Sequence, residues 1–129
     1  MAHPDKPVVA ACGDGGFMYN VQELATAVLH RIPLVTIVFN DNAFGNVKRT
    51  QINSYDGKVI ATDLHNPDFV RLAECFGAAG VLAKTPDELK AAIRKGFDEK
   101  GPTLIEVPVG EMPNPWHMVM PPPVRPKKK

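Results

Sequence analysis

The sequence carries almost no net charge and contains no long apolar segment. Its 15 Lys and Arg residues nearly balance its 14 Asp and Glu residues, which leaves a formal net charge of +1. Such a balance produces no field that would attract nucleic acid or an anionic membrane surface. No apolar run approaches the ~18 residues that a membrane-spanning helix requires. We therefore expect neither nucleic acid nor a membrane among the partners of this chain.

Cysteine is scarce as well, since Cys12 and Cys75 are the two thiols of the chain. Two thiols without the spacing of a disulfide framework favour a reducing compartment. The first residues also lack the apolar core of a secretory signal peptide. We therefore expect a cytoplasmic protein in which both cysteines pack against apolar segments and do not act as nucleophiles.

What the sequence does contain is a regular alternation of short apolar runs with helical patterns. Residues 34–39 are apolar without polar alternation, which is typical of a parallel strand buried on both faces. Residues 21–29 repeat apolar side chains with the period of a helix. Further strands are expected at 8–12, 81–83 and 103–107. This order predicts the α/β class, as a three-layer Rossmann-like domain with a mostly parallel sheet and helices on both faces.

Local signals mark where the expected helices begin and end. Residues 20–23 and 85–88 each have the form of a capping box. Pro67 is expected at the first position of another helix, which ends at Gly77. The stretch from 43 to 64 is less regular, and we expect a loop with some helix there.

Glycine and acidic residues follow two of the expected strands. The first strand is followed by Gly-Asp-Gly-Gly at 13–16, and the second by Asn-Asp-Asn at 40–42. In open α/β sheets, ligands bind outside the carboxyl ends of the strands. If one right-handed crossover makes these two strands neighbours, Asp14 and Asp41 face one small site.

The residue types at these positions suit a hard cation and a phosphate group. Magnesium prefers oxygen ligands, usually one or two carboxylates together with phosphate and water. Two isolated carboxylates that face each other repel, and a divalent ion between them removes that cost. Glycines let backbone N–H groups approach phosphate oxygens. The pattern therefore predicts a magnesium site that binds a diphosphate.

This pairing carries a resemblance to a known family. Gly-Asp-Gly at 13–15, the helix after it and Asn-Asp at 40–41 resemble the signature of thiamine-diphosphate enzymes. Gly-Phe at 16–17, Gln-Glu-Leu at 22–24 and Asn-Asp-Asn-Ala-Phe-Gly-Asn-Val at 40–47 are most similar to the acetolactate synthase and benzoylformate decarboxylase branch. The fold that this resemblance implies is the thiamine diphosphate-binding fold.

The resemblance runs from about residue 4 to residue 109. It implies a cofactor-binding domain at 1–109, followed by a Pro- and Met-rich tail at 110–129. This family's domain has more chain before the first motif strand, so we expect a domain that is partial on its N-terminal side. The chain is then the carboxyl-terminal part of a larger enzyme, an isolated domain or one component of a split enzyme. Whether Trp116 and the methionines of the tail dock on a neighbour or are loosely ordered stays open.

By resemblance, the magnesium ligands are the side chains of Asp14 and Asp41 and the main-chain carbonyl of Ala43. Many relatives have Asn where this sequence has Asp41, and a slip of the second ligand to Asn42 stays open. The resemblance also implies that backbone N–H groups bind the phosphates, and that further residues border the cofactor. These residues are Gly13, Gly15, Gly16, Phe17, Phe44, Gly45 and Asn46.

The resemblance implies thiamine diphosphate and Mg²⁺ as cofactors and a 2-oxo acid as substrate. The thiazolium ylid of the cofactor attacks the 2-oxo acid and stabilises the resulting carbanion for decarboxylation or carboligation. Such an enzyme is an acetolactate synthase-like transferase or lyase, and is expected to be a homo-oligomer.

One catalytic group of this family has no counterpart in the chain. The glutamate that activates the aminopyrimidine ring lies on a separate pyrimidine-binding domain, usually of a neighbouring subunit. Glu23 does not replace it, because the capping box at 20–23 accounts for that residue. We therefore expect no catalytic residue here, and no activity without the pyrimidine-binding domain or subunit.

Two other interpretations stay open. The first is a non-catalytic module with the same fold, used for assembly or regulation. The second is a dinucleotide-binding domain. Residues 13–16 lack the third glycine of the dinucleotide fingerprint, and Asp14 would repel a pyrophosphate in the absence of a metal. The second interpretation is therefore the weaker one.

A partial domain should expose apolar surface that neighbouring segments would otherwise cover. We therefore predict that the purified chain self-associates, as measured by light scattering over a range of concentrations. A clean monomer throughout that range would contradict the prediction.

Overall fold

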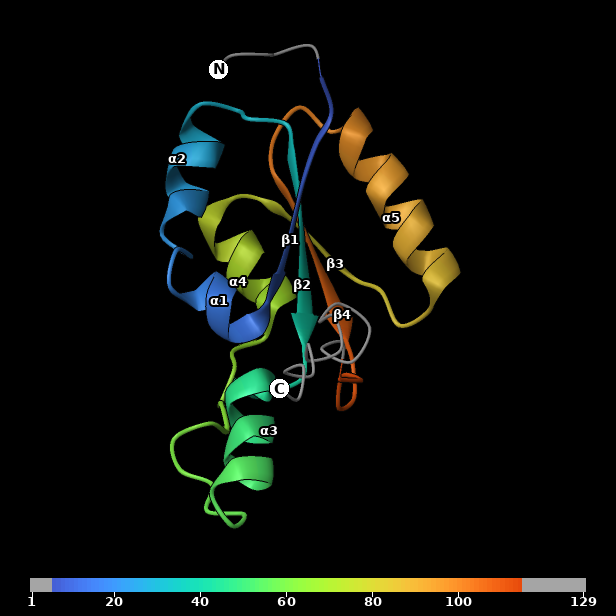
Figure 1. Ribbon diagram of the computed structural model, residues 1–129. Helices are drawn as coiled ribbons and strands as arrows, with labels where there is room; N and C mark the ends of the chain where they lie inside the picture. Colours follow the sequence, from blue (N-terminus) through green and yellow to red (C-terminus); the bar gives the residue numbers. More distant parts are fainter. Residues whose placement is uncertain (1–5, 115–129) are drawn as a thin grey trace, which may run out of the picture.

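A parallel β-sheet covered by helices on both faces forms the centre of the molecule (Figure 1). The computed structural model describes residues 6–114. Along this part of the chain the elements are β1 (Val8–Gly13), α1 (Asp14–Met18), α2 (Glu23–Leu29), β2 (Leu34–Asn40), α3 (Gly45–Ser54), α4 (Phe69–Phe76), β3 (Ala79–Leu82), α5 (Pro86–Asp98) and β4 (Thr103–Pro108).

The described strands lie side by side in the order β1-β2-β4-β3, and every neighbouring pair is parallel. The register of β1 places Gly13 opposite Phe39 of β2, and Asn40 of β2 lies opposite Pro108 of β4. The carboxyl ends of these three strands therefore meet at one edge of the sheet. The α/β class, the parallel sheet and the adjacency of the first two strands are confirmed.

Two apolar layers pack against the sheet, one on each face. Figure 1 shows α5 on one face, and α1, α2 and α4 on the other. Val35 and Ile37 of β2 belong to the cluster that contains Ala92 of α5. Val38 belongs to the opposite cluster, together with Phe69 of α4. Because side chains along a strand alternate between faces, β2 is buried on both, as predicted.

Two of the expected helix boundaries are confirmed. The side chain of Thr85 accepts a hydrogen bond from the backbone N–H of Glu88, and the carboxylate of Glu88 accepts one from the backbone N–H of Thr85. Gly77 ends α4 in the left-handed conformation, with φ of +86°. The N-cap of α4 is Asp68, whose side chain accepts from the N–H of Arg71. Pro67 therefore precedes the cap, and does not occupy the first helical position.

The capping box expected at residues 20–23 is wrong. Residues 14–18 form a short helix where the sequence suggested a glycine turn, and successive turns lead from it directly into α2. The residue before α2 is Gln22, whose backbone is helical and whose side chain caps nothing. A side-chain cap usually needs an extended backbone at that position. Glu23 therefore starts α2 as an exposed residue without the capping partner.

Three further observations concern the periphery of the fold. Cys12 is half-buried, whereas Cys75 is exposed, so the expectation that Cys75 is packed is wrong. No regular element follows β4 as far as Asn114, and Trp116, Met118 and Met120 of the expected tail lie outside the described residues. Between residues 6 and 114, no helix is long and apolar enough to cross a bilayer.

Gly80 of β3 allows the strand to lie closely against α4. A methyl group at this position would lie 2.6 Å from the backbone oxygen of Val70. We predict that Gly80→Ala lowers the free energy of unfolding by about 1–3 kcal/mol, because backbone atoms must shift. Urea denaturation measures the change. Gly101→Ala is the matched control, since nothing lies within 4 Å of a methyl group there. Equal effects of the two substitutions would contradict this close packing.

Candidate functional site

A cavity of about 380 Å³ opens at the carboxyl ends of β1 and β2. Its wall is formed by the start of α1, the turn after β2, the start of α3 and the segment after β4. Nearly all the residues that the sequence placed at the cofactor line this cavity. These residues are Gly13, Asp14, Gly15, Gly16, Asp41, Ala43, Phe44, Gly45 and Asn46.

Asp14 is the most buried acidic residue of the cavity, with 1% of its surface exposed. Its Oδ1 accepts a hydrogen bond of 2.9 Å from the backbone N–H of Gly15. Its Oδ2 accepts one of 2.5 Å from the side-chain amide of Asn66. A buried carboxylate is costly unless such bonds satisfy it. These contacts hold the Asp14 carboxylate in one orientation.

Asp41 lies in the turn after β2 and is more exposed than Asp14. Its Oδ1 accepts a hydrogen bond of 3.1 Å from the backbone N–H of Ala43. Burial, together with the charge and hydrogen bonding of Asp14, raises the pKa of the Asp41 carboxyl, although the bond from Ala43 opposes this shift. Both carboxyl groups line this cavity, close enough for the charge of Asp14 to affect Asp41. A divalent ion between them would relieve their repulsion.

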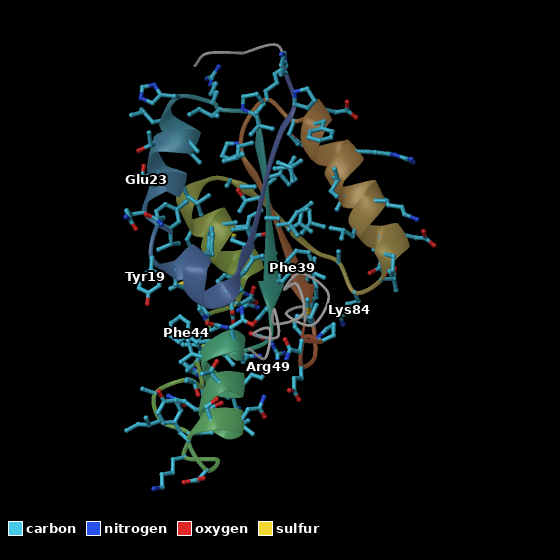
Figure 2. All side chains as sticks on the ribbon, viewed as in Figure 1. Tyr19, Glu23, Phe39, Phe44, Arg49 and Lys84 are labelled. Atoms are coloured by element: carbon cyan, nitrogen blue, oxygen red, sulfur yellow. The ribbon has the colours of Figure 1, made fainter. Side chains whose placement is uncertain are left out.

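Two glycines leave room for the atoms of the site. A methyl group at Gly45 would lie 2.7 Å from Oδ2 of Asp41, and one at Gly15 would overlap the ring of Phe44. The Phe44 ring stacks in turn on Tyr19, with centroids 6.3 Å apart and planes inclined by 22° (Figure 2). Side chains at either glycine would therefore displace an acidic ligand candidate or an aromatic wall of the cavity.

The turn after β2 is held by a second strand-like segment. The N–H of Phe44 donates to the carbonyl of Thr62, and the N–H of Leu64 donates to the carbonyl of Asn42. Between these bonds, Ala43 forms an isolated antiparallel bridge with Asp63. The backbone around Ala43 is consequently held in place beside the two carboxylates.

Phe17 is the one expected cofactor residue that does not line the cavity. Its side chain is 8% exposed and lies in the core, where it packs edge-to-face on Phe69 with a centroid distance of 5.7 Å. Asp14 begins the short helix α1, and Phe17, three positions later, belongs to the core cluster that also contains Leu24 and Phe69. The position of Phe17 indicates a packing role.

Arg49 was not singled out from the sequence, yet it lines the cavity. Figure 2 shows it between α3 and the carboxyl end of β4. Its guanidinium donates to the side-chain oxygen of Asn46 and to the backbone carbonyl of Met112. The spacing of Asn46 and Arg49 on one helix face was visible in the sequence. The approach of Met112, which follows β4, depends on the tertiary structure.

Within residues 6–114, no group of three or more His, Cys, Asp or Glu side chains is placed to hold a metal ion. The side-chain donors at this cavity are the two carboxylates of Asp14 and Asp41, and the backbone of Ala43 lies beside them. Such oxygen donors suit magnesium, which usually takes one or two carboxylates and completes its shell with phosphate and water. The residues present fit that ion together with a phosphorylated ligand.

Comparison with known proteins assigns the chain to a family. The sequence profile of the family described as "Thiamine pyrophosphate enzyme, C-terminal TPP binding domain" matches residues 1–107. The chain belongs to this family. Membership replaces the dinucleotide-binding interpretation, and confirms the resemblance on which the expected fold and cofactor rested.

Individual relatives of this family member are acetolactate synthases and decarboxylases. The chain is 40% identical over 109 residues to the acetolactate synthase of Bacillus subtilis, covering 84% of this chain and 19% of that protein. It is 41% identical over 101 residues to the acetolactate synthase large subunit of Haemophilus influenzae, covering 78% and 18%. The crystal structure of benzoylformate decarboxylase from Polynucleobacter necessarius superposes with a TM-score of 0.79 at 31% identity, covering 86% and 21%.

The two thiols of this family member should differ in reactivity. Burial raises the pKa of the Cys12 thiol, which also donates to the carbonyl of Ile37, so little thiolate forms at neutral pH. Cys75 is exposed. We predict that one thiol per chain reacts rapidly with Ellman's reagent, and that Cys75→Ser abolishes this rapid phase. Rapid labelling of the Cys75→Ser variant would contradict the burial of Cys12.

Proposed function

We propose that this chain anchors the diphosphate of thiamine diphosphate through Mg²⁺. We propose further that it belongs to an acetolactate synthase-like enzyme acting on 2-oxo acids. The observation that carries the proposal is the meeting of Asp14 and Asp41 in one cavity beside the glycine backbone of residues 13–16. Family membership supports the choice of cofactor. The chain spans about a fifth of the length of the curated relatives it matches, so the activity and substrate belong to the proposal.

The residues of the cavity divide the binding between them. Asp14 is the rigid ligand, because hydrogen bonds hold both of its oxygens. Asp41 is the more exposed ligand, and its charge completes a site of two carboxylates. The main-chain carbonyl of Ala43 is the third protein ligand. Backbone N–H groups of Gly15 and Gly16 bind phosphate oxygens, as glycine-rich phosphate loops do.

Bound thiamine diphosphate supplies the thiazolium group that accepts electrons when the bond to the substrate carboxylate breaks. The chain's own part is to bind and orient the cofactor. Apart from Asp14 and Asp41, no acidic side chain in the described part lines the cavity. Glu23 lies on α2, apart from Phe44 and Arg49 at the strand ends (Figure 2). A group that activates the aminopyrimidine ring must therefore come from another domain or subunit.

This division of work leads to the remaining parts of the proposal. The chain alone is inactive, and it acts as a transferase or lyase only with a pyrimidine-binding domain or subunit in a homo-oligomer. Its two free cysteines suit the reducing cytoplasm. If the reconstituted assembly binds the cofactor but turns over neither pyruvate nor benzoylformate, the non-catalytic module is the better interpretation.

Calorimetry with thiamine diphosphate tests the binding part of the proposal. We predict binding in the presence of Mg²⁺ and none with EDTA. Loss of a residue that only orients a metal ligand typically weakens metal binding by about 10- to 100-fold. Asp14→Ala removes a direct ligand, so it should weaken binding by at least this factor. Asp41→Asn should retain Mg²⁺-dependent binding, since it keeps an oxygen donor.

Asp98→Ala, at the far end of α5, is the matched control for the loss of one acidic side chain, and should bind the cofactor as the wild type does. Binding that is equally strong in EDTA, or an Asp14→Ala variant with wild-type affinity, would overturn the proposed metal site.

A further inference from the structure

Asn66 connects the acidic site to the neighbouring strand ends. It lies in the segment before α4, 52 positions from Asp14 in the sequence. Its Nδ2 donates a hydrogen bond of 2.5 Å to Oδ2 of Asp14 and one of 2.9 Å to Oδ1 of Asn40. The side-chain oxygen of Asn42 lies 3.4 Å from the same nitrogen. The half-buried amide of Asn66 therefore connects the carboxyl end of β1 with the carboxyl end of β2 through hydrogen bonds.

Which side-chain atom donates and which accepts in these hydrogen bonds follows from the carboxylates at the two ends, Glu106 and Asp14. An ionised carboxylate accepts hydrogen bonds and donates none. At one end, Glu106 of β4 accepts a bond of 2.8 Å from Nδ2 of Asn40. The Oδ1 of Asn40 then faces Asn66 as an acceptor. Both N–H groups of Asn66 are thereby used, one on Asn40 and the other on Asp14.

The resulting relay, Glu106–Asn40–Asn66–Asp14, crosses from β4 through β2 to the start of α1. It is built entirely from side chains, and it ends on the most buried acid of the cavity. Each carboxylate has about four acceptor positions. Asp14 uses one for Gly15 and one for Asn66, so both of its oxygens keep capacity for a cation.

Asn66 contacts Asp14 from outside the main cavity. It does not line the main cavity, but a neighbouring pocket of about 270 Å³ together with Tyr19 and Phe44. Asn66 therefore acts on a ligand in the main cavity through its hydrogen-bonded partners, and among these Asp14 is the one that lines the cavity. Carboxylates that bind metals are commonly oriented by such hydrogen-bonded partners.

We propose that Asn66 is a positioning residue, which holds the Asp14 carboxylate in the orientation that accepts the divalent cation. This inference rests on the proposed function of the cavity, and extends it to a residue outside the expected ligand set. Asn40 supports Asn66 in turn, because it takes up the second N–H and keeps the amide directed at Asp14.

The test is a titration of the full chain with Mn²⁺ and thiamine diphosphate, followed by electron paramagnetic resonance. Asn66→Ala should weaken Mn²⁺ binding by about 10- to 100-fold. It should also change the spectrum of the bound ion, since the Asp14 carboxylate becomes free to turn. Asn66→Ser, with a shorter side chain and a single donor, should lie between the wild type and Asn66→Ala. Asn20→Ala, at an exposed asparagine between α1 and α2, is the matched control.

The outcomes separate this inference from the proposed function. A folded Asn66→Ala variant with wild-type affinity and spectrum overturns the role of Asn66 alone. A wild-type chain that binds no Mn²⁺ overturns the proposed metal site, and this inference with it. Urea denaturation without metal shows whether each variant is folded. Should Asn66→Ala fail to fold, Asn66→Ser decides: weaker binding supports the positioning role, and wild-type affinity overturns it.

Discussion

The candidate site depends on two like charges that the fold brings together. Asp14 and Asp41 follow neighbouring parallel strands, and both line one cavity. Burial is the main cause of the raised pKa of the Asp41 carboxyl, and the nearby charge of Asp14 contributes to it. The repulsion between the two carboxylates therefore costs free energy in the absence of a cation. A protein retains such an arrangement when a bound group offsets the cost.

Several independent features hold these charges in place. The parallel register ends β1 and β2 at the same edge of the sheet. Pairing of residues 42–44 with 62–64 holds the turn that carries Asp41. Close contacts exclude side chains at Gly15 and Gly45. The amide of Asn66 reaches Asp14 from the segment before α4. The site is therefore a product of the whole carboxyl edge of the sheet, and no single loop forms it.

The proposed division between cofactor binding by this chain and ring activation by another domain follows from the acidic residues that line the cavity. Two acidic side chains and a glycine backbone can bind a metal diphosphate, whereas the described part of the chain offers no further acid to the cavity. We therefore propose that this chain anchors the cofactor, and that another domain or subunit activates the aminopyrimidine ring. The same fold supports many functions, so the argument for an enzyme rests on this site and on the relatives. A non-catalytic module would keep the same anchoring geometry without the turnover.

The sequence by itself determined the strands, the parallel sheet, the capping box at Thr85 and the pairing of Asp14 with Asp41, because these follow from periodicity and from motifs at strand ends. Only the tertiary structure decided that Phe17 packs in the core, that Cys75 is exposed, and that residues 20–23 form no capping box. It also brought Arg49 and Asn66 to the site. Local patterns describe one element at a time, whereas the direction of a side chain and contacts between distant segments depend on how the elements pack together.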